Sequence, residues 1–229
     1  MLSRIKILGA PDESFIREPM PLDQSLAWVS PDQHLVNPGV EIFLAQSAYL
    51  RLVEHTASDL ENEVGGLLIG AGRVDPATDR PYILIEDILP ALHTESGQTF
   101  VTFTQDTLVK LHGELENRFP GQRIVGWYHT HPGLGVFLSS YDRWLHEHFF
   151  NDPRQVALVI DPCQDAGGFF CWQVHGQLDP SHPTGFFEWR KEQPGSVVTW
   201  HNLKPLSDEL PGEPDAGRAN GLDPEEATW

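Results

Sequence analysis

One stretch near the middle of the chain limits the architecture more than any other. Residues 123–150 read RIVGWYHTHPGLGVFLSSYDRWLHEHFF. The run Ile124–Thr130 is apolar, β-branched and aromatic, which is typical of a strand within a sheet. Side chains alternate along a strand, so His129 and His131 lie on the same face. Pro132 then ends the strand, and the glycines that follow it predict a loop.

A helix is expected after this loop. From Ser139 onward, apolar residues recur at helical spacing, and Asp142 falls in the first turn. The stretch therefore directs two imidazoles from a strand end toward a helix that begins with a carboxylate. Two histidines and one carboxylate form a ligand set for zinc that leaves one tetrahedral position open to water. An open position is typical of catalytic rather than structural zinc, and the metal lowers the pKa of bound water to about 7.

A simpler interpretation applies to the start of the helix. Ser139 and Asp142 form Ser-x-x-Asp, an acidic variant of the capping box, which explains both residues through helix capping alone. Capping explains neither His129 nor His131. The histidine pair therefore favours the metal site.

The spacing of these residues resembles a known motif. His-x-His, seven residues, Ser, two residues and Asp is similar to the JAMM motif of the JAB1/MPN zinc metalloproteases, and the flanking text GWYHTHPG and FLSSYD resembles that family as well. The resemblance implies that His129, His131 and Asp142 bind Zn²⁺. It also implies that Ser139 hydrogen-bonds the reacting carbonyl or its tetrahedral intermediate.

The same resemblance implies a catalytic glutamate on an earlier strand. In the family this glutamate precedes a run of glycine and apolar residues and acts as general acid and base. Glu63 stands before Val64–Gly70 and is the matching position. Without the resemblance, the residues alone do not distinguish Glu63 from Glu61 or Glu54.

The rest of the chain predicts one α+β domain with a mixed or antiparallel sheet and helices on its faces. Further strands are expected at 40–44, 64–70, 82–89, 100–103, 156–161, 169–174 and 185–189, and helices at 45–56 and 104–119. The resemblance implies the MPN-type, cytidine-deaminase-like layered form of this architecture. We expect the domain to span residues 39–190, between an N-terminal extension (1–38) and an acidic, proline-rich C-terminal tail (191–229).

Composition narrows the choice of partners and compartment. The 229 residues are 40% hydrophobic, enough for one sizeable core, and the net charge of −18 disfavours nucleic acid. We expect no signal peptide and no membrane span, because no apolar run reaches ~18 residues. Cys163 and Cys171 are expected as two buried thiols in a reducing cytoplasm, with the alternative that they face each other across a hairpin and form a disulfide or bind metal.

We therefore hypothesise a zinc-dependent (iso)peptidase that cleaves at the C-terminal tail of a ubiquitin-like protein, from a conjugate or a precursor. The substrate, and partners from a ubiquitin-like activating or conjugating pathway, come from the resemblance alone. Short connections favour a compact, bacterial deubiquitinase-like enzyme. The alternatives are a hydrolase that removes a small adduct from a ubiquitin-like sulfur-carrier protein, and a non-catalytic MPN scaffold. A DNA-repair-associated branch of the same fold usually has Asn between the two histidines and Pro before the serine. This chain has Thr130 and Leu138 at those positions, so its resemblance to that branch is weaker.

Overall fold

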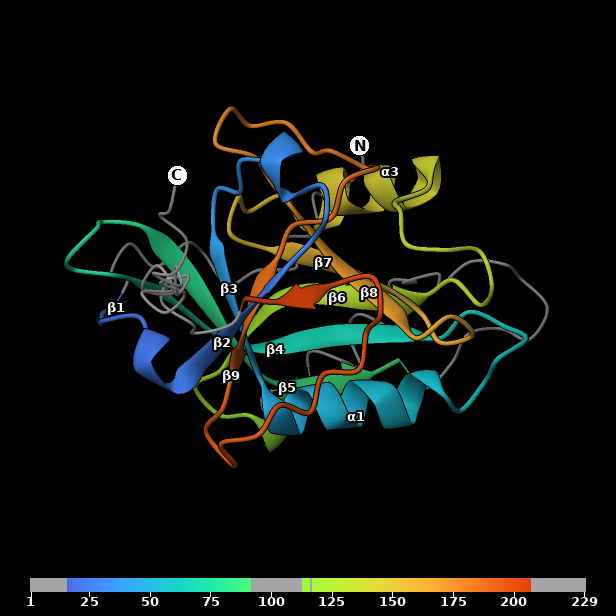
Figure 1. The fold of residues 1–229 in the computed structure, drawn as a ribbon, viewed down its shortest axis with the longest axis horizontal. Coiled ribbons are helices and arrows are strands. Elements are labelled where there is room, and N and C mark those ends of the chain that lie inside the picture. The colour runs from blue at the N-terminus through green and yellow to red at the C-terminus, as the bar shows by residue number, and fades with distance from the viewer. Residues whose placement is uncertain (1–15, 92–112, 116, 207–229) are drawn as a thin grey trace, which may run out of the picture.

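The computed structural model describes residues 16–91, 113–115 and 117–206. Its centre is a single mixed sheet with the strand order β10-β2-β9-β3-β5-β4-β6-β7-β8, and β1 pairs with β4 (Figure 1). The strands are β1 Ile16–Arg17, β2 Ser25–Val29, β3 Glu41–Ala45, β4 Gly65–Val74, β5 Pro81–Pro90, β6 Arg123–Thr130, β7 Val156–Asp161, β8 Ala166–Cys171, β9 Phe186–Trp189 and β10 Lys204–Pro205. The α-helices α1 and α3 span Gln46–Thr56 and Ser140–Phe149, and short 3-10 helices cover Leu22–Gln24 and Gln33–Leu35. The α+β prediction is confirmed.

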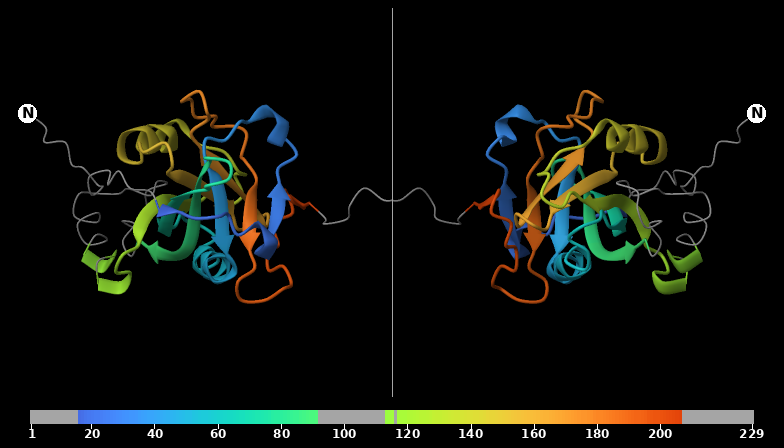
Figure 2. Two further views of the ribbon diagram at one scale, coloured as in Figure 1. Left: turned by 90° about the vertical axis from the view of Figure 1, so that its left-hand side faces the viewer. Right: turned by 90° about the vertical axis from the view of Figure 1, so that its right-hand side faces the viewer.

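The two helices lie on opposite faces of the sheet, as the side views in Figure 2 show. One apolar cluster lies under α1 and includes Tyr49 and Leu52. A second cluster lies under α3 and includes Leu145 and Trp127. Because side chains alternate along a strand, β6 contributes Tyr128 to the first cluster and Trp127 to the second.

The neighbours of β6 define one functional edge of the sheet. β6 pairs antiparallel with β4 and parallel with β7. His129 lies opposite Gly65 on β4 and Val159 on β7. The residues just before β4 and just after β6 and β7 therefore meet at the same edge.

Most of the predicted elements are present, with different ends. β4 continues to Val74, and the hairpin at 75–80 closes with a 3.0 Å hydrogen bond from the Asp75 amide to the Arg80 carbonyl. β8 covers Ala166–Cys171 rather than 169–174. The strand expected at 100–103 and the first part of the helix expected at 104–119 lie outside the described residues, while 113–115 and 117–118 are helical.

Residues on both sides of 39–190 also join the fold. β1 and β2 come from the N-terminal side, and β10 from the C-terminal side. Val198, Trp200 and Leu203 are buried in the cluster under α1. The boundaries at 38 and 190 stay a prediction, and the tail beyond residue 206 lies outside the described residues.

A buried carboxylate holds the segment after β9 in place. Glu188 is fully buried, and its carboxylate accepts four hydrogen bonds. Its donors are Trp28 Nε1 at 3.1 Å, Gln46 Nε2 at 3.0 Å, Ser196 Oγ at 2.6 Å and the Val197 amide at 2.8 Å. Because these donors come from separate parts of the chain, this carboxylate joins β2, α1 and residues 196–197 to β9.

The cysteine alternative is wrong. Both cysteines are free. Cys171 is buried opposite Val156, as predicted, but Cys163 is exposed in the turn after β7, so its predicted burial is wrong. The two thiols therefore do not face each other across the hairpin. Separately, in the part of the chain that the structure describes, no helix has the length and apolar character needed to cross a bilayer.

Candidate functional site

The three predicted metal ligands converge at the functional edge. The Nε2 atoms of His129 and His131 lie 3.0 Å apart. Asp142 places Oδ1 at 3.3 Å from His129 Nε2 and Oδ2 at 3.6 Å from His131 Nε2. All three residues are buried, and one candidate ligand atom from each lies within 4.8 Å of the others. We call these three residues the His-His-Asp cluster.

Glu63 borders this cluster. It lies two residues before β4, its side chain is 10% exposed, and its Oε1 is 3.9 Å from His131 Nε2. Two 2.9 Å hydrogen bonds set this position: the Val64 amide donates to Thr130 Oγ1, and the Thr130 amide donates to the Val64 carbonyl. The threonine between the two histidines therefore fixes the backbone next to Glu63.

The start of α3 has the predicted capping box, and it shares a residue with the cluster. Ser139 is the N-cap, and its Oγ accepts a 3.2 Å hydrogen bond from the Asp142 amide. Asp142 Oδ2 accepts a 2.7 Å hydrogen bond from the Ser139 amide. The capping and ligand interpretations are thus compatible, because one carboxylate takes part in both. The Ser139 hydroxyl, as an acceptor from Asp142, still has its own hydrogen to donate.

The electrostatics of the cluster favour the protonation states that bind metal. Burial lowers the pKa of His129 below its ordinary value, although the Asp142 carboxylate opposes this effect. Burial alone raises the pKa of Asp142, but its interactions with the His129 and His131 side chains outweigh that effect and hold this pKa well below its usual range. A neutral imidazole and an ionised carboxylate are the ligand forms of these side chains. The donor set therefore fits zinc.

The loop between His131 and Ser139 is held by Asp161, at the end of β7. Asp161 is fully buried and accepts hydrogen bonds from the amides of Gly133 at 2.9 Å and Gly135 at 2.8 Å. Both glycines have positive φ, +73° and +89°, which favours glycine and turns both amides toward one carboxylate. The amides of Cys163 and Gln164 and the Gln164 side chain also donate to Asp161.

Sequence reasoning did not identify Asp161 as part of the site. The usable signal was its place at the carboxyl end of a strand, because the carboxyl ends of neighbouring parallel strands meet at one edge. The strand was predicted, but its parallel pairing with β6 was not.

The same loop gives the cluster an apolar border. The rings of Phe137 and His131 lie 4.8 Å apart, tilted by 50°. Phe137 is 38% exposed and Leu134 is 61% exposed. A partly exposed apolar side chain, Phe137, therefore lies directly beside the cluster, and the exposed Leu134 belongs to the same loop.

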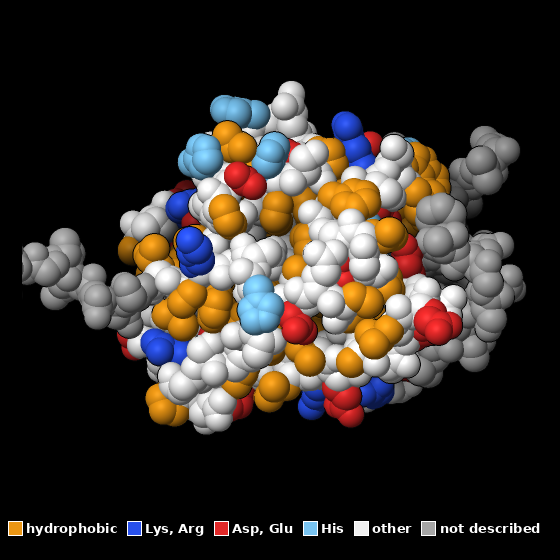
Figure 3. Space-filling view, turned by 45° about the vertical axis from the view of Figure 1, so that its right-hand side comes forward, with side chains coloured by type: hydrophobic (Ala, Val, Ile, Leu, Met, Phe, Trp, Pro, Cys, Tyr) orange, Lys and Arg blue, Asp and Glu red, His pale blue; other side chains and the backbone are white. Residues whose placement is uncertain are grey.

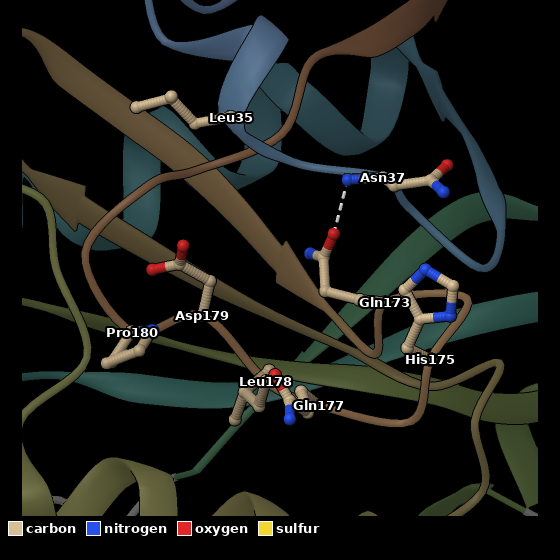
Figure 4. A pocket seen from close by; sticks show the side chains of 8 residues that line it. All are labelled: Leu35, Asn37, Gln173, His175, Gln177, Leu178, Asp179 and Pro180. Carbon is tan, nitrogen blue, oxygen red and sulfur yellow. Dashed lines mark hydrogen bonds between the residues drawn. The ribbon is translucent and has the colours of Figure 1, made fainter.

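The structure also has a hollow lined by other residues. It has a volume of about 450 Å³ and is lined by Leu35, Asn37, Gln173, His175, Gln177, Leu178, Asp179 and Pro180 (Figure 4). None of its lining residues belongs to the His-His-Asp cluster. On the face shown in Figure 3, acidic and basic side chains of the described residues are interspersed with apolar ones, and histidine side chains lie both at the upper left and near the middle.

Known proteins are similar to this chain across the same region. A family profile described as "JAB1/Mov34/MPN/PAD-1 ubiquitin protease" matches residues 38–152. The 26S proteasome regulatory subunit rpn11 of Schizosaccharomyces pombe is 29% identical over 151 residues, which are 66% of this chain and 47% of that protein. The ubiquitin carboxyl-terminal hydrolase RPN11 of Saccharomyces cerevisiae is 30% identical over 128 residues, 56% of this chain and 40% of that protein.

A third relative has higher identity. The uncharacterized protein F37A4.5 of Caenorhabditis elegans is 34% identical over 146 residues, 60% of this chain and 42% of that protein. The chain therefore spans less than half of the length of each of these three relatives. The matched region contains the His-His-Asp cluster, Glu63 and Ser139.

Proposed function

Because the chain belongs to the JAB1/Mov34/MPN/PAD-1 family, we propose that it is a zinc-dependent (iso)peptidase that cleaves at the C-terminal tail of a ubiquitin-like protein. The observation that carries the proposal is the convergence of His129, His131 and Asp142 at one sheet edge, with Glu63 beside them. A capping box alone requires neither histidine. The ubiquitin-directed activity is supported by relatives whose names describe a ubiquitin hydrolase and proteasome subunits.

In this proposal His129, His131 and Asp142 hold the zinc ion, which would act as a Lewis acid that polarises the scissile carbonyl and activates water at neutral pH. The other residues move protons and orient the substrate. Glu63 takes a proton from the attacking water onto its carboxylate and returns it to the leaving amine. If that amine belongs to a lysine side chain, the reaction is isopeptide hydrolysis.

Ser139 supplies a hydrogen-bond donor to the oxygen on which negative charge develops. One such donor is typically worth about 2.7 to 4 kcal/mol of transition-state stabilisation. The capping bond fixes the donor, because the Ser139 oxygen accepts from the Asp142 amide and cannot swing freely. The apolar Phe137 and Leu134 give the substrate chain a surface to lie against. Both free cysteines fit a reducing compartment, so a cytosolic location is part of the proposal.

The test compares three substrates with zinc-loaded protein: a lysine-linked ubiquitin-like conjugate, a C-terminally extended precursor and a sulfur-carrier protein bearing a small adduct. Cleavage is followed by intact mass, with Glu63→Gln as the control. Cleavage of the conjugate or precursor after the modifier's last residue is the expected result. Cleavage of the small adduct alone would assign the second hydrolase, and zinc binding without any cleavage would favour a scaffold. Either result would overturn the proposal.

A further inference from the structure

The orientation of the His129 imidazole ring is held without a hydrogen bond to its second nitrogen from any described residue. Histidines that bind metal almost always donate their second ring nitrogen to a carboxylate, carbonyl or water, which fixes the ring plane. His129 Nδ1 and His131 Nδ1 are buried, and neither has a hydrogen-bond partner among the residues described. Another contact has to hold the His129 ring.

Trp127 provides that contact. It lies two residues before His129 on β6, so both side chains are on the face toward α3. The two rings are stacked, with centroids 4.7 Å apart and planes only 10° from parallel. Rotation of the imidazole about its χ2 angle would break this stack. The indole therefore sets the plane in which His129 presents Nε2.

The indole is itself held by the helix that carries Asp142. Trp127 Nε1 donates a 3.1 Å hydrogen bond to His146 Nδ1. His146 follows Asp142 by four residues, so the two side chains lie on the same face of α3. Contacts therefore run from His129 through Trp127 to His146, and along one helical turn to Asp142.

His146 is a costly residue in this position. It is fully buried and lies against the rings of Phe150 and Trp172, at centroid distances of 6.3 and 5.6 Å. Because Nδ1 accepts from Trp127, the proton of the neutral ring is on Nε2. Nε2 is buried with no partner within the described part of the chain. An apolar side chain would fill the space without that cost, so the acceptor for Trp127 is the distinguishing contribution of His146.

We propose that Trp127 and His146 are positioning residues for the metal site: together they fix the ring plane of His129 and the place of Asp142 relative to β6. The proposal rests on the zinc site of the proposed function. Its physical content is preorganisation, because ligands already held in the binding geometry lose less freedom when the ion binds.

The test measures the zinc affinity of metal-free protein by competition with a chromophoric chelator. Trp127→Phe keeps a stacking ring but removes the N–H, and His146→Leu removes the acceptor. We expect each single variant to bind zinc about 10-fold to 100-fold more weakly, the range for outer partners of metal ligands. Both changes break the same hydrogen bond. The double variant should therefore bind zinc no more weakly than the single variant that has the lower zinc affinity. His146→Gln, whose carbonyl can accept from the indole, should recover part of the affinity.

Two variants serve as matched controls. Tyr128→Phe removes the 2.9 Å hydrogen bond to His55 on the opposite face of the same strand, and Trp144→Phe changes an exposed tryptophan of α3. Both should bind zinc as the wild type does. A fall in the thermal midpoint of Trp127→Phe and His146→Leu with unchanged zinc affinity would overturn the proposal and leave a packing role. Additive losses in the double variant would overturn it as well.

The measurement separates this proposal from the proposed function. Wild-type protein that binds zinc tightly but cleaves none of the three substrates removes the peptidase assignment, while the affinities of the variants still decide the roles of Trp127 and His146. Wild-type protein that takes up no zinc overturns both.

Discussion

Asp142 and Glu188 are both buried carboxylates, but they differ in what surrounds them. The partners of Glu188 are four hydrogen-bond donors from the protein, which together satisfy both of its oxygens. Asp142 takes one backbone donor and otherwise faces two imidazole nitrogens that also face each other. Two neutral imidazoles and a carboxylate have lone pairs to share, and one positive ion satisfies all three at once.

This difference separates a structural carboxylate from a functional one. A carboxylate saturated by donors holds segments together and has no capacity left for a ligand. A carboxylate set among other acceptors is incomplete without a cation. Both carboxylates are buried, so burial does not distinguish them. The difference lies in whether the neighbouring groups are hydrogen-bond donors or acceptors.

Glu63→Gln should have the largest effect and would identify the carboxylate that moves protons. The amide introduced by this substitution cannot accept a proton at neutral pH, so turnover should fall by about 10² to 10⁴-fold. Zinc content should be unchanged, because Glu63 is outside the His-His-Asp cluster. The measurement is kcat on the cleaved substrate together with metal analysis. Full activity would remove Glu63 from the chemistry.

His131→Asn should have the next largest effect, on the metal. Loss of one of three protein ligands should weaken zinc binding by at least about 100-fold, whereas the metal-free protein should lose no more than about 1 kcal/mol of unfolding free energy. Chelator competition and denaturant unfolding measure the two quantities. Equal zinc affinity in the variant and the wild type would contradict the ligand assignment.

Glu188→Gln should show the reverse pattern. One oxygen becomes an amide group that faces a hydrogen-bond donor such as the Trp28 indole N–H, so the free energy of unfolding should fall by about 2 to 3 kcal/mol. Zinc affinity should not change. Glu192→Gln is the matched control, because Glu192 is exposed and its side chain accepts a hydrogen bond from the Ser47 hydroxyl at the surface. A loss of zinc affinity in Glu188→Gln with no loss of stability would break the comparison.

Asp161→Asn tests the intermediate case, a donor-saturated carboxylate next to the cluster. An amide group would face the Gly133 or Gly135 N–H, loosen the loop after His131 and weaken zinc binding by about 10-fold. Asp165→Asn is the control, because Asp165 is exposed and its positive φ of 44° suits asparagine. If Asp161→Asn lowered stability alone, Asp161 would belong with Glu188.

The sequence predicted the parts of the site that depend on local pattern. The alternation of β6 places His129 and His131 on one face, and the capping pattern places Asp142 in the first turn of α3. The choice of Glu63 over Glu61 or Glu54 needed the family resemblance, because the pairing of Val64 with Thr130 joins residues 66 positions apart.

Other contacts followed only from the tertiary structure. Residues 191–206 fall within the predicted acidic, proline-rich tail, yet Val198 and Trp200 are buried, and Glu188 accepts a hydrogen bond from the Val197 amide beside them. Nothing in the sequence points to the role of His146, because its hydrogen bond to Trp127 has no local sequence signature. The bend of the chain after Asp161 likewise put Cys163 in the turn, away from Cys171.

The capping box has a thermodynamic consequence beyond geometry. Asp142 closes the first turn of α3 and also completes the cluster, so the turn cannot fray without opening the metal site. By linkage, any ion that binds only the closed form must also disfavour the opening of that turn, by about 2.7 kcal/mol when its free concentration is 100 Kd. Amide hydrogen exchange at the beginning of this helix should therefore slow as the metal site is filled, so the exchange rate measures metal occupancy without any substrate.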